Sequence, residues 1–203
     1  MSSRWTAAPR GCGFGDDSVT LRRVNPLLLA AGCFLLIDGV ATVERHRQRA
    51  EFFKLATRAA RERGKPLLIV GSPSGWSTTT PSSMQRHGCG DGARGDVVID
   101  IAPVVRECPN GVRADVRDLS RWRDGYFGAV YMSCVAEHVD DLRAGWREIK
   151  RVAADPKGER IFVVFPQAWS PFSVWCGAHR WVIEDIRDGK IRARPIPGRG
   201  AIS

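Results

Sequence analysis

Apolar residues dominate positions 26–43, where leucine, isoleucine, valine, phenylalanine and alanine follow one another with few polar interruptions. These 18 residues are close to the shortest helix that spans a bilayer. Residues 1–25, by contrast, are rich in glycine and polar side chains and show no apolar period. We therefore expect a flexible tail over 1–25, followed by a hydrophobic helix over 26–43.

Asp38 is the one charged residue within this apolar stretch. A carboxylate near mid-membrane costs about 2.5–3.5 kcal/mol on insertion scales, but Asp38 lies toward one end, where it can face the headgroups. More arginines follow the stretch than precede it, which favours a cytosolic location for the rest of the chain. We predict a single-pass membrane anchor; the alternative is a buried helix of a cytoplasmic protein.

A helical pattern continues over residues 44–63, and we expect an amphipathic helix there. It ends at Gly64, and Pro66 prevents its continuation. The apolar side of this helix is made by Phe52, Phe53, Leu55, Ala56, Ala59 and Ala60.

From Leu67 onward, short apolar runs alternate with polar or helical segments, which is typical of a parallel sheet. Apolar residues at three- and four-residue steps predict a helix over 140–153. Segments 180–186 and 190–196 flank Arg187-Asp-Gly, the signature of a hairpin. The predicted strands are 67–71, 96–101, 111–114, 127–133 and 160–165.

This pattern predicts an α/β fold over 44–203: a Rossmann-like, mostly parallel sheet with a C-terminal antiparallel hairpin, preceded by the N-terminal hydrophobic helix. A chain of 203 residues is long enough for one such domain. Its 31 Lys and Arg against 22 Asp and Glu give a net charge of +9. The basic residues are spread along the chain without long runs, so we favour a solvated surface over nucleic-acid binding.

Six cysteines lie far apart and form no C-x-x-C pair. We therefore expect free thiols in a reducing compartment. His87, Cys89 and Cys108 could supply three zinc ligands, but no second pair of ligands accompanies them. We predict no metal site.

Four segments stand in a characteristic order. An apolar strand at 67–75 runs into a glycine-bearing turn, and a second strand at 96–101 carries an acid near its end. Segments 112–115 and 126–140 follow, the last ending in Glu-His-Val-Asp. In this order and spacing the chain resembles the class I S-adenosylmethionine-dependent methyltransferases, in particular the small-molecule branch, whose fourth strand leads into a Leu-Glu-His-Val-like helix start.

The resemblance implies S-adenosylmethionine as the cofactor, with glycines letting the backbone approach it after the first strand. It further implies that the acid after the second strand accepts from the ribose hydroxyls, the acid after the third from the adenine amine, and that the fourth strand ends beside the methionine part. Taken singly, each acid could instead cap a turn. The implied cofactor-binding residues are Gly71, Ser72, Gly75, Asp100, Asp115 and Ser133.

Three positions depart from the family pattern. Ile69 stands where an acid usually precedes the first glycine, Pro73 replaces the middle glycine of the turn, and Gly128 replaces the acid that begins the fourth strand. The segment between Gly75 and Asp96 is rich in helix breakers, so we expect no long helix there. These departures keep open a second reading, in which the fold is retained without catalysis.

We therefore expect a membrane-tethered methyltransferase-like protein that methylates a small or lipid-borne acceptor. The alternative is an inactive, scaffolding subunit of a membrane-associated assembly. No residue stands out as a catalytic base, and His138 fits a structural role. Residues 166–175 hold aromatics that could line the acceptor site or contact a membrane surface.

Overall fold

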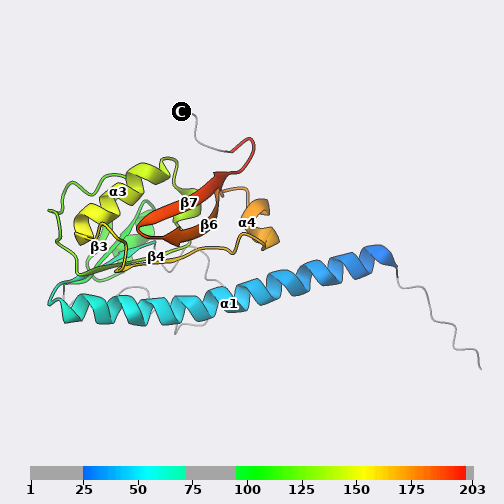
Figure 1. The fold of residues 1–203 in the computed structure, drawn as a ribbon, viewed down its shortest axis with the longest axis horizontal. Helices are drawn as coiled ribbons and strands as arrows, with labels where there is room; N and C mark the ends of the chain where they lie inside the picture. The colour runs from blue at the N-terminus through cyan, green and yellow to red at the C-terminus, as the bar shows by residue number, and fades with distance from the viewer. Residues whose placement is uncertain (1–24, 72–94, 200–203) are drawn as a thin grey trace, which may run out of the picture.

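The computed structural model describes residues 25–71 and 95–199. Within them lies a five-stranded parallel sheet of order β3-β2-β1-β4-β5, and a separate two-stranded sheet of β6 and β7 (Figure 1). The predicted fold class is confirmed. The strands of the large sheet are β1 (Leu67–Val70), β2 (Val97–Asp100), β3 (Gly111–Arg113), β4 (Ala129–Ser133) and β5 (Ile161–Val164).

Helix α1 (Pro26–Glu62) is 37 residues long and unbroken, so the two helices expected over 26–43 and 44–63 are one. Its N-cap is Asn25, whose side chain accepts from the Leu27 amide at 2.9 Å. Pro26 occupies the first helical position, where its lack of a backbone N–H leaves no donor to satisfy. Gly64, at φ +61°, follows its end as expected.

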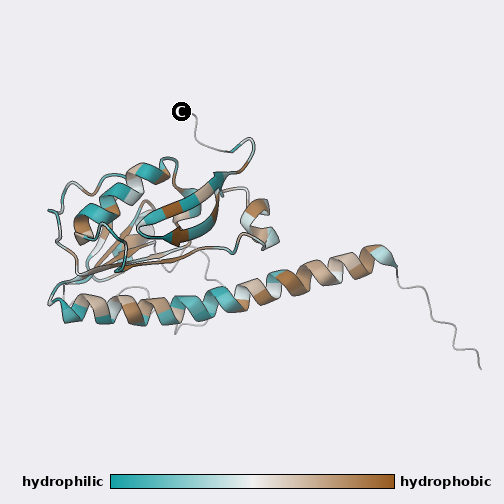
Figure 2. Ribbon diagram, viewed as in Figure 1, coloured by the Kyte–Doolittle hydropathy of each residue, from teal (hydrophilic) through white to brown (hydrophobic). Residues whose placement is uncertain are grey.

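The second half of α1 packs on one face of the sheet, and the first half projects beyond the domain (Figure 1). Because strand side chains alternate between faces, Leu67 and Ile69 of β1 pack with Ala56 and Ala60 of α1. The projecting half is mostly apolar (Figure 2), with Asp38 as its one charged residue, and most of its leucines are exposed. The helix is long and apolar enough to cross a membrane.

The opposite face of the sheet is covered by α3 (Leu142–Ala153), the helix expected over 140–153. Trp146 and Ile149 of α3 pack against Leu68 and Val130 of the strands. At the N-terminus, the Asp141 side chain accepts from the Ala144 amide at 2.9 Å. This acid satisfies one of the free amides of the first turn.

Strands β6 (Trp181–Arg187) and β7 (Lys190–Pro195) form the expected hairpin. Asp188 and Gly189 both have positive φ, as a two-residue hairpin turn of this type requires. The hairpin is a separate two-stranded sheet and does not extend the large one. It lies over the α3 side instead (Figure 1), where the Trp146 indole donates to the Gly189 carbonyl at 2.8 Å.

The amino ends of the strands are held by a buried ion pair. Asp96 is 1% exposed and accepts two hydrogen bonds from the Arg61 guanidinium, at 2.7 and 2.6 Å, and one from the Leu67 amide at 2.9 Å. Arg61 lies in the last turn of α1, so the pair fixes the helix end against β1.

Three described cysteines, Cys33, Cys134 and Cys176, are free thiols, as expected. Cys108 is disulfide-bonded, so the expectation of free thiols is wrong at this position. A disulfide sulfur is not a zinc ligand, and His87 and Cys89 lie outside the described residues.

Candidate functional site

In an open parallel sheet, ligands bind beyond the carboxyl ends of the strands, where the strand order reverses. Here the order reverses between β1 and β4, the two strands paired at the centre of the sheet. Gly71 follows β1, and Ser133 ends β4. The carboxyl edge around these two residues is therefore the candidate ligand site.

Gly71 allows two backbone segments to approach closely at this edge. Its φ is +97°, and a Cβ placed there would lie 2.6 Å from the Val135 side chain and 3.0 Å from the Ser133 carbonyl oxygen. No other residue fits without displacing the segment that follows β4. Ser72 and Gly75, also expected at the cofactor, lie outside the described residues.

Asp100 ends β2, the strand next to β1, as the family pattern requires. One carboxylate oxygen accepts from the Ala102 amide at 2.8 Å. The next residue, Ile101, is 66% exposed although it is a large apolar side chain. Ile101 was not identified as a site residue from the sequence. The pattern that could have indicated it is an isoleucine directly after Asp100, the acid that ends β2.

Asp115 follows β3 along the same edge, because the Ala114 amide donates to the Asp100 carbonyl at 3.0 Å. Its carboxylate is paired with the Arg117 guanidinium at 2.6 Å. Hydrogen bonding from Arg117 lowers the pKa of Asp115, against a smaller opposing effect of burial. The carboxylate is thus ionised, and part of its capacity to accept hydrogen bonds is already used.

Arg49 of α1 reaches the end of β4, a contact that the sequence did not predict. Its Nε donates to the Ser133 hydroxyl at 3.1 Å, and its Nη2 donates to the Cys134 sulfur at 3.0 Å. Cys134 has φ +52°, a conformation that costs energy for a residue with a side chain. A strained residue and a fixed guanidinium therefore meet at the switch point of the sheet.

The packing of α1 explains two departures from the family pattern. Ile69 is fully buried against this helix, where a carboxylate would lose its hydration. At Gly128, a Cβ would lie 2.9 Å from both the Cα and the carbonyl oxygen of Ala60. An acid at either position is incompatible with the close approach of α1 to the sheet.

Glu137 lies in η3 (Ala136–His138), the short turn after β4. It is 1% exposed, and neither carboxylate oxygen has a hydrogen-bond partner. Burial raises the pKa of Glu137 to about 7, although the positive charges of Arg45 and Arg49 oppose this rise. Sequence reasoning gave Glu137 no role beyond opening a helix.

A hollow of about 500 Å³ lies elsewhere on the described surface. It is lined by Asp124, Pro156 and residues from the end of α3, and it lies at the amino ends of the strands. The architecture favours the opposite edge for a ligand, so we do not assign function to this hollow.

Comparison with known proteins identifies a family over part of the chain. Residues 95–161 match the family model of a methyltransferase domain, a segment that begins before β2 and ends at the start of β5. The resemblance to the class I S-adenosylmethionine-dependent methyltransferases is confirmed over this segment. No curated protein and no solved structure matches the chain.

Proposed function

We propose that this protein is an S-adenosylmethionine-dependent methyltransferase, tethered to a membrane by α1, that acts on a small or lipid-borne acceptor. The observation that carries the proposal is the junction of Gly71 with the segment after β4, at the switch point of a sheet in a chain with a matching methyltransferase domain.

The side chains at the carboxyl edge fit the cofactor in chemical type. Asp100 offers a carboxylate oxygen to the ribose hydroxyls, and the exposed Ile101 offers an apolar surface to the adenine ring. Asp115 accepts from the adenine amine with the capacity that Arg117 leaves free. With Ser72 and Gly75 these residues complete the proposed cofactor site.

We place the methionine part of the cofactor at the end of β4. There Arg49, fixed by Ser133 and Cys134, offers a guanidinium to the cofactor carboxylate. Bound S-adenosylmethionine supplies a methyl group on a sulfonium, and transfer from a sulfonium needs chiefly the correct placement of the acceptor. This chemistry is compatible with a site that shows no evident catalytic base.

The exposed half of α1 supports the membrane tether. Leu27, Leu28 and Leu35 are at least 70% exposed, an apolar surface larger than soluble proteins usually leave open. Asp38 accepts from the Ser170 hydroxyl at 3.1 Å, which partly compensates its carboxylate. Trp175, 73% exposed, packs on Phe34 with ring centroids 5.0 Å apart, as an aromatic at a membrane interface would.

A second candidate function is that of an inactive scaffold in a membrane-associated assembly. Two observations favour it. Ile69 stands where the family has the acid that indirectly holds the amino group of the methionine part. The Asp115 carboxylate is already paired with the Arg117 guanidinium. The two candidates share a fold and differ in cofactor affinity.

Calorimetric titration of the full-length protein in detergent micelles with S-adenosylmethionine separates them. We expect binding in the micromolar range that weakens at least tenfold in Asp100→Ala. Asp124→Ala is the matched control, because it removes an exposed carboxylate at the opposite edge of the sheet. No binding at millimolar cofactor would favour the scaffold.

A further inference from the structure

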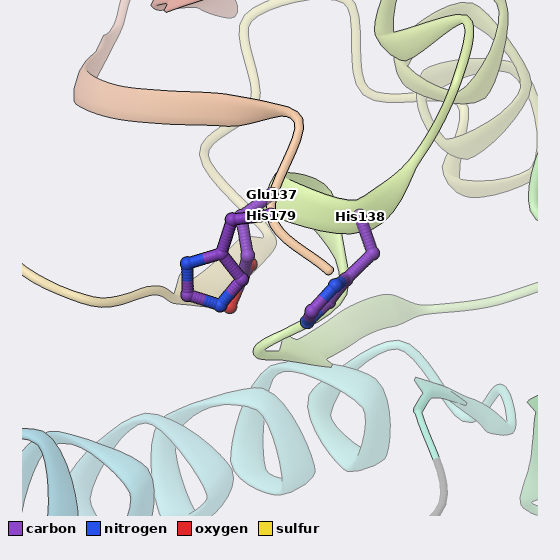
Figure 3. Close-up of side chains that lie close together, drawn as sticks. All are labelled: Glu137, His138 and His179. Carbon is purple, nitrogen blue, oxygen red and sulfur yellow. The ribbon is translucent and has the colours of Figure 1, made fainter. Parts of the chain in front are cut away.

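Three potential metal ligands meet beside the candidate site: Glu137, His138 and His179. The first two come from η3, and the third comes from the segment between α4 (Pro171–Trp175) and β6 (Figure 3). One ligand atom of each lies within 4.8 Å of those of the other two. They form the one such group that the structure shows in residues 25–71 and 95–199.

The carboxylate of Glu137 is buried without a well-formed hydrogen bond to a described residue. It is 1% exposed, and neither oxygen has a partner of hydrogen-bond geometry, although its own amide and the Cys134 thiol are near enough to lower its pKa against the effect of burial. A buried carboxylate is neutralised by a proton or stabilised by a cation. The positive charges of Arg45 and Arg49 act on this carboxylate, but the hydrogen bonds that they donate among the described residues go to Thr42, Ser133 and Cys134, and Nη1 of Arg45 is itself buried without a partner.

Both histidines are oriented by backbone carbonyls. Nδ1 of His138 lies 3.0 Å from the Ala178 carbonyl oxygen, and Nδ1 of His179 lies 2.9 Å from that of Ser173. A carbonyl oxygen only accepts, so each Nδ1 carries the hydrogen. The neutral ring then presents the lone pair of Nε2. Histidines that bind metals are commonly oriented in this way, with the other ring nitrogen donating to a carbonyl.

We propose that Glu137, His138 and His179 bind a divalent transition-metal ion of the zinc class. Two imidazole nitrogens and one carboxylate oxygen form a ligand set typical of zinc sites with an open position. The fourth position would be filled by water or by an oxygen of a bound ligand. The inference stands on these three residues and does not rest on the proposed methyl transfer.

The present separation of the ligand atoms is compatible with a small closure. Zinc bonds of about 2.1 Å in a tetrahedron place the ligand atoms about 3.4 Å apart. The ligand atoms lie within 4.8 Å of one another, so binding shortens each separation by at most about 1.4 Å. His138 is the most accessible of the three residues.

The test uses the full-length protein in detergent micelles, stripped with a chelator and titrated with Zn²⁺. We expect one equivalent to bind with micromolar or tighter affinity and to raise the melting temperature. Co²⁺ in place of Zn²⁺ should give the visible absorption of a four-coordinate site. His179→Gln and Glu137→Gln should each weaken binding at least tenfold, whereas His46→Gln, a histidine of α1 outside this group, should not.

Folding of each variant is checked by its metal-free melting curve. Glu137→Gln preserves size and removes only the charge, so it remains informative if His179→Gln does not fold. The proposal is overturned if the wild-type protein binds neither ion below millimolar concentration. It is also overturned if Glu137→Gln binds as tightly as the wild type, because Glu137 would then hold a proton and not a metal.

Discussion

Asp96 and Glu137 are both 1% exposed, yet their surroundings differ completely. Asp96, at the amino ends of the strands, accepts from the Arg61 guanidinium and from the Leu67 amide. Glu137, beyond the carboxyl ends, has no described partner of good hydrogen-bond geometry, and only its own amide and the Cys134 thiol lie near enough to affect its pKa by hydrogen bonding. The first carboxylate stabilises the fold, and the second lies unsatisfied beside a strained residue, Cys134, at the edge where a ligand is expected.

The same contrast distinguishes two glycines. Gly128 permits the packing of α1 on the sheet, so its role is structural. Gly71 permits the end of β1 to approach the segment after β4 at the switch point, where we propose that the cofactor binds. The amino ends of the strands therefore carry a satisfied ion pair, and the proposed ligand site lies at the opposite end of the sheet.

The largest effect is expected at Asp96. Asp96→Asn leaves Arg61 without its charged partner, and breaking a buried pair costs about 3–5 kcal/mol. Glu137→Gln in metal-free buffer should cause no loss of stability, because it removes a buried charge that has no partner. Urea unfolding in micelles measures both. Equal destabilisation by the two variants would contradict the claim that Asp96 stabilises the fold and Glu137 does not.

The two glycines should separate stability from ligand binding. Gly128→Ala forces α1 away from the sheet and should lower stability by about 1–3 kcal/mol without a specific loss of cofactor affinity. Gly71→Ala should lower both the stability and the cofactor affinity, because the positive φ of Gly71 and the nearby Val135 side chain exclude a methyl group. Gly177→Ala, with nothing within 4 Å of the added Cβ, is the control. A Gly71→Ala protein that binds cofactor like the wild type would show that this junction does not contact it.

A smaller effect is expected from Arg49. Arg49→Gln keeps a donor near the position of Nε, which bonds Ser133, but removes the Nη2 contact with Cys134 and the charge offered to the cofactor carboxylate. We expect about tenfold weaker binding of S-adenosylmethionine and unchanged binding of adenosine, which lacks that carboxylate. Titration calorimetry with both ligands checks this. An equal loss for both would assign Arg49 a structural role instead.

The smallest effect concerns Asp115. Its pKa is lowered by hydrogen bonding to Arg117, so the stabilisation is present above the usual pKa of 3.8 and is lost as pH falls below it. The Arg117 and Asp115 side chains are 39% and 35% exposed. Solvent screens such a pair, so it adds at most about 1 kcal/mol to the free energy of unfolding. Arg117→Gln should therefore flatten the fall in melting temperature between about pH 5 and 3 only slightly. A large change would indicate that Asp115 is more tightly coupled than its exposure implies.

Much of the fold followed from local patterns. The runs of apolar residues predicted all five strands of the sheet, and Arg187-Asp-Gly predicted the hairpin turn. The position of the hairpin did not follow, because it depends on a contact between Trp146 and Gly189, 43 residues apart. The continuity of α1 was also missed, since an apolar half and an amphipathic half look like separate helices in sequence.

The candidate site was predictable only where a residue follows a strand. Gly71, Asp100 and Asp115 were proposed for the cofactor site from the family resemblance, which assigns roles to residues at strand ends. Glu137 and His179 were not connected, because no sequence pattern brings together residues from η3 and the segment before β6. Arg49 was likewise missed, since it reaches Ser133 from a helix 84 positions earlier in the chain.

The most direct test of the central claim is ultraviolet cross-linking of radiolabelled S-adenosylmethionine to the full-length protein in micelles, followed by peptide mapping. The account predicts that the label is found on peptides containing the ends of β2 and β4, around Asp100 and Ser133, and that unlabelled cofactor competes for it. Absence of a competed label, or labelling confined to the hollow beside the end of α3, would contradict it.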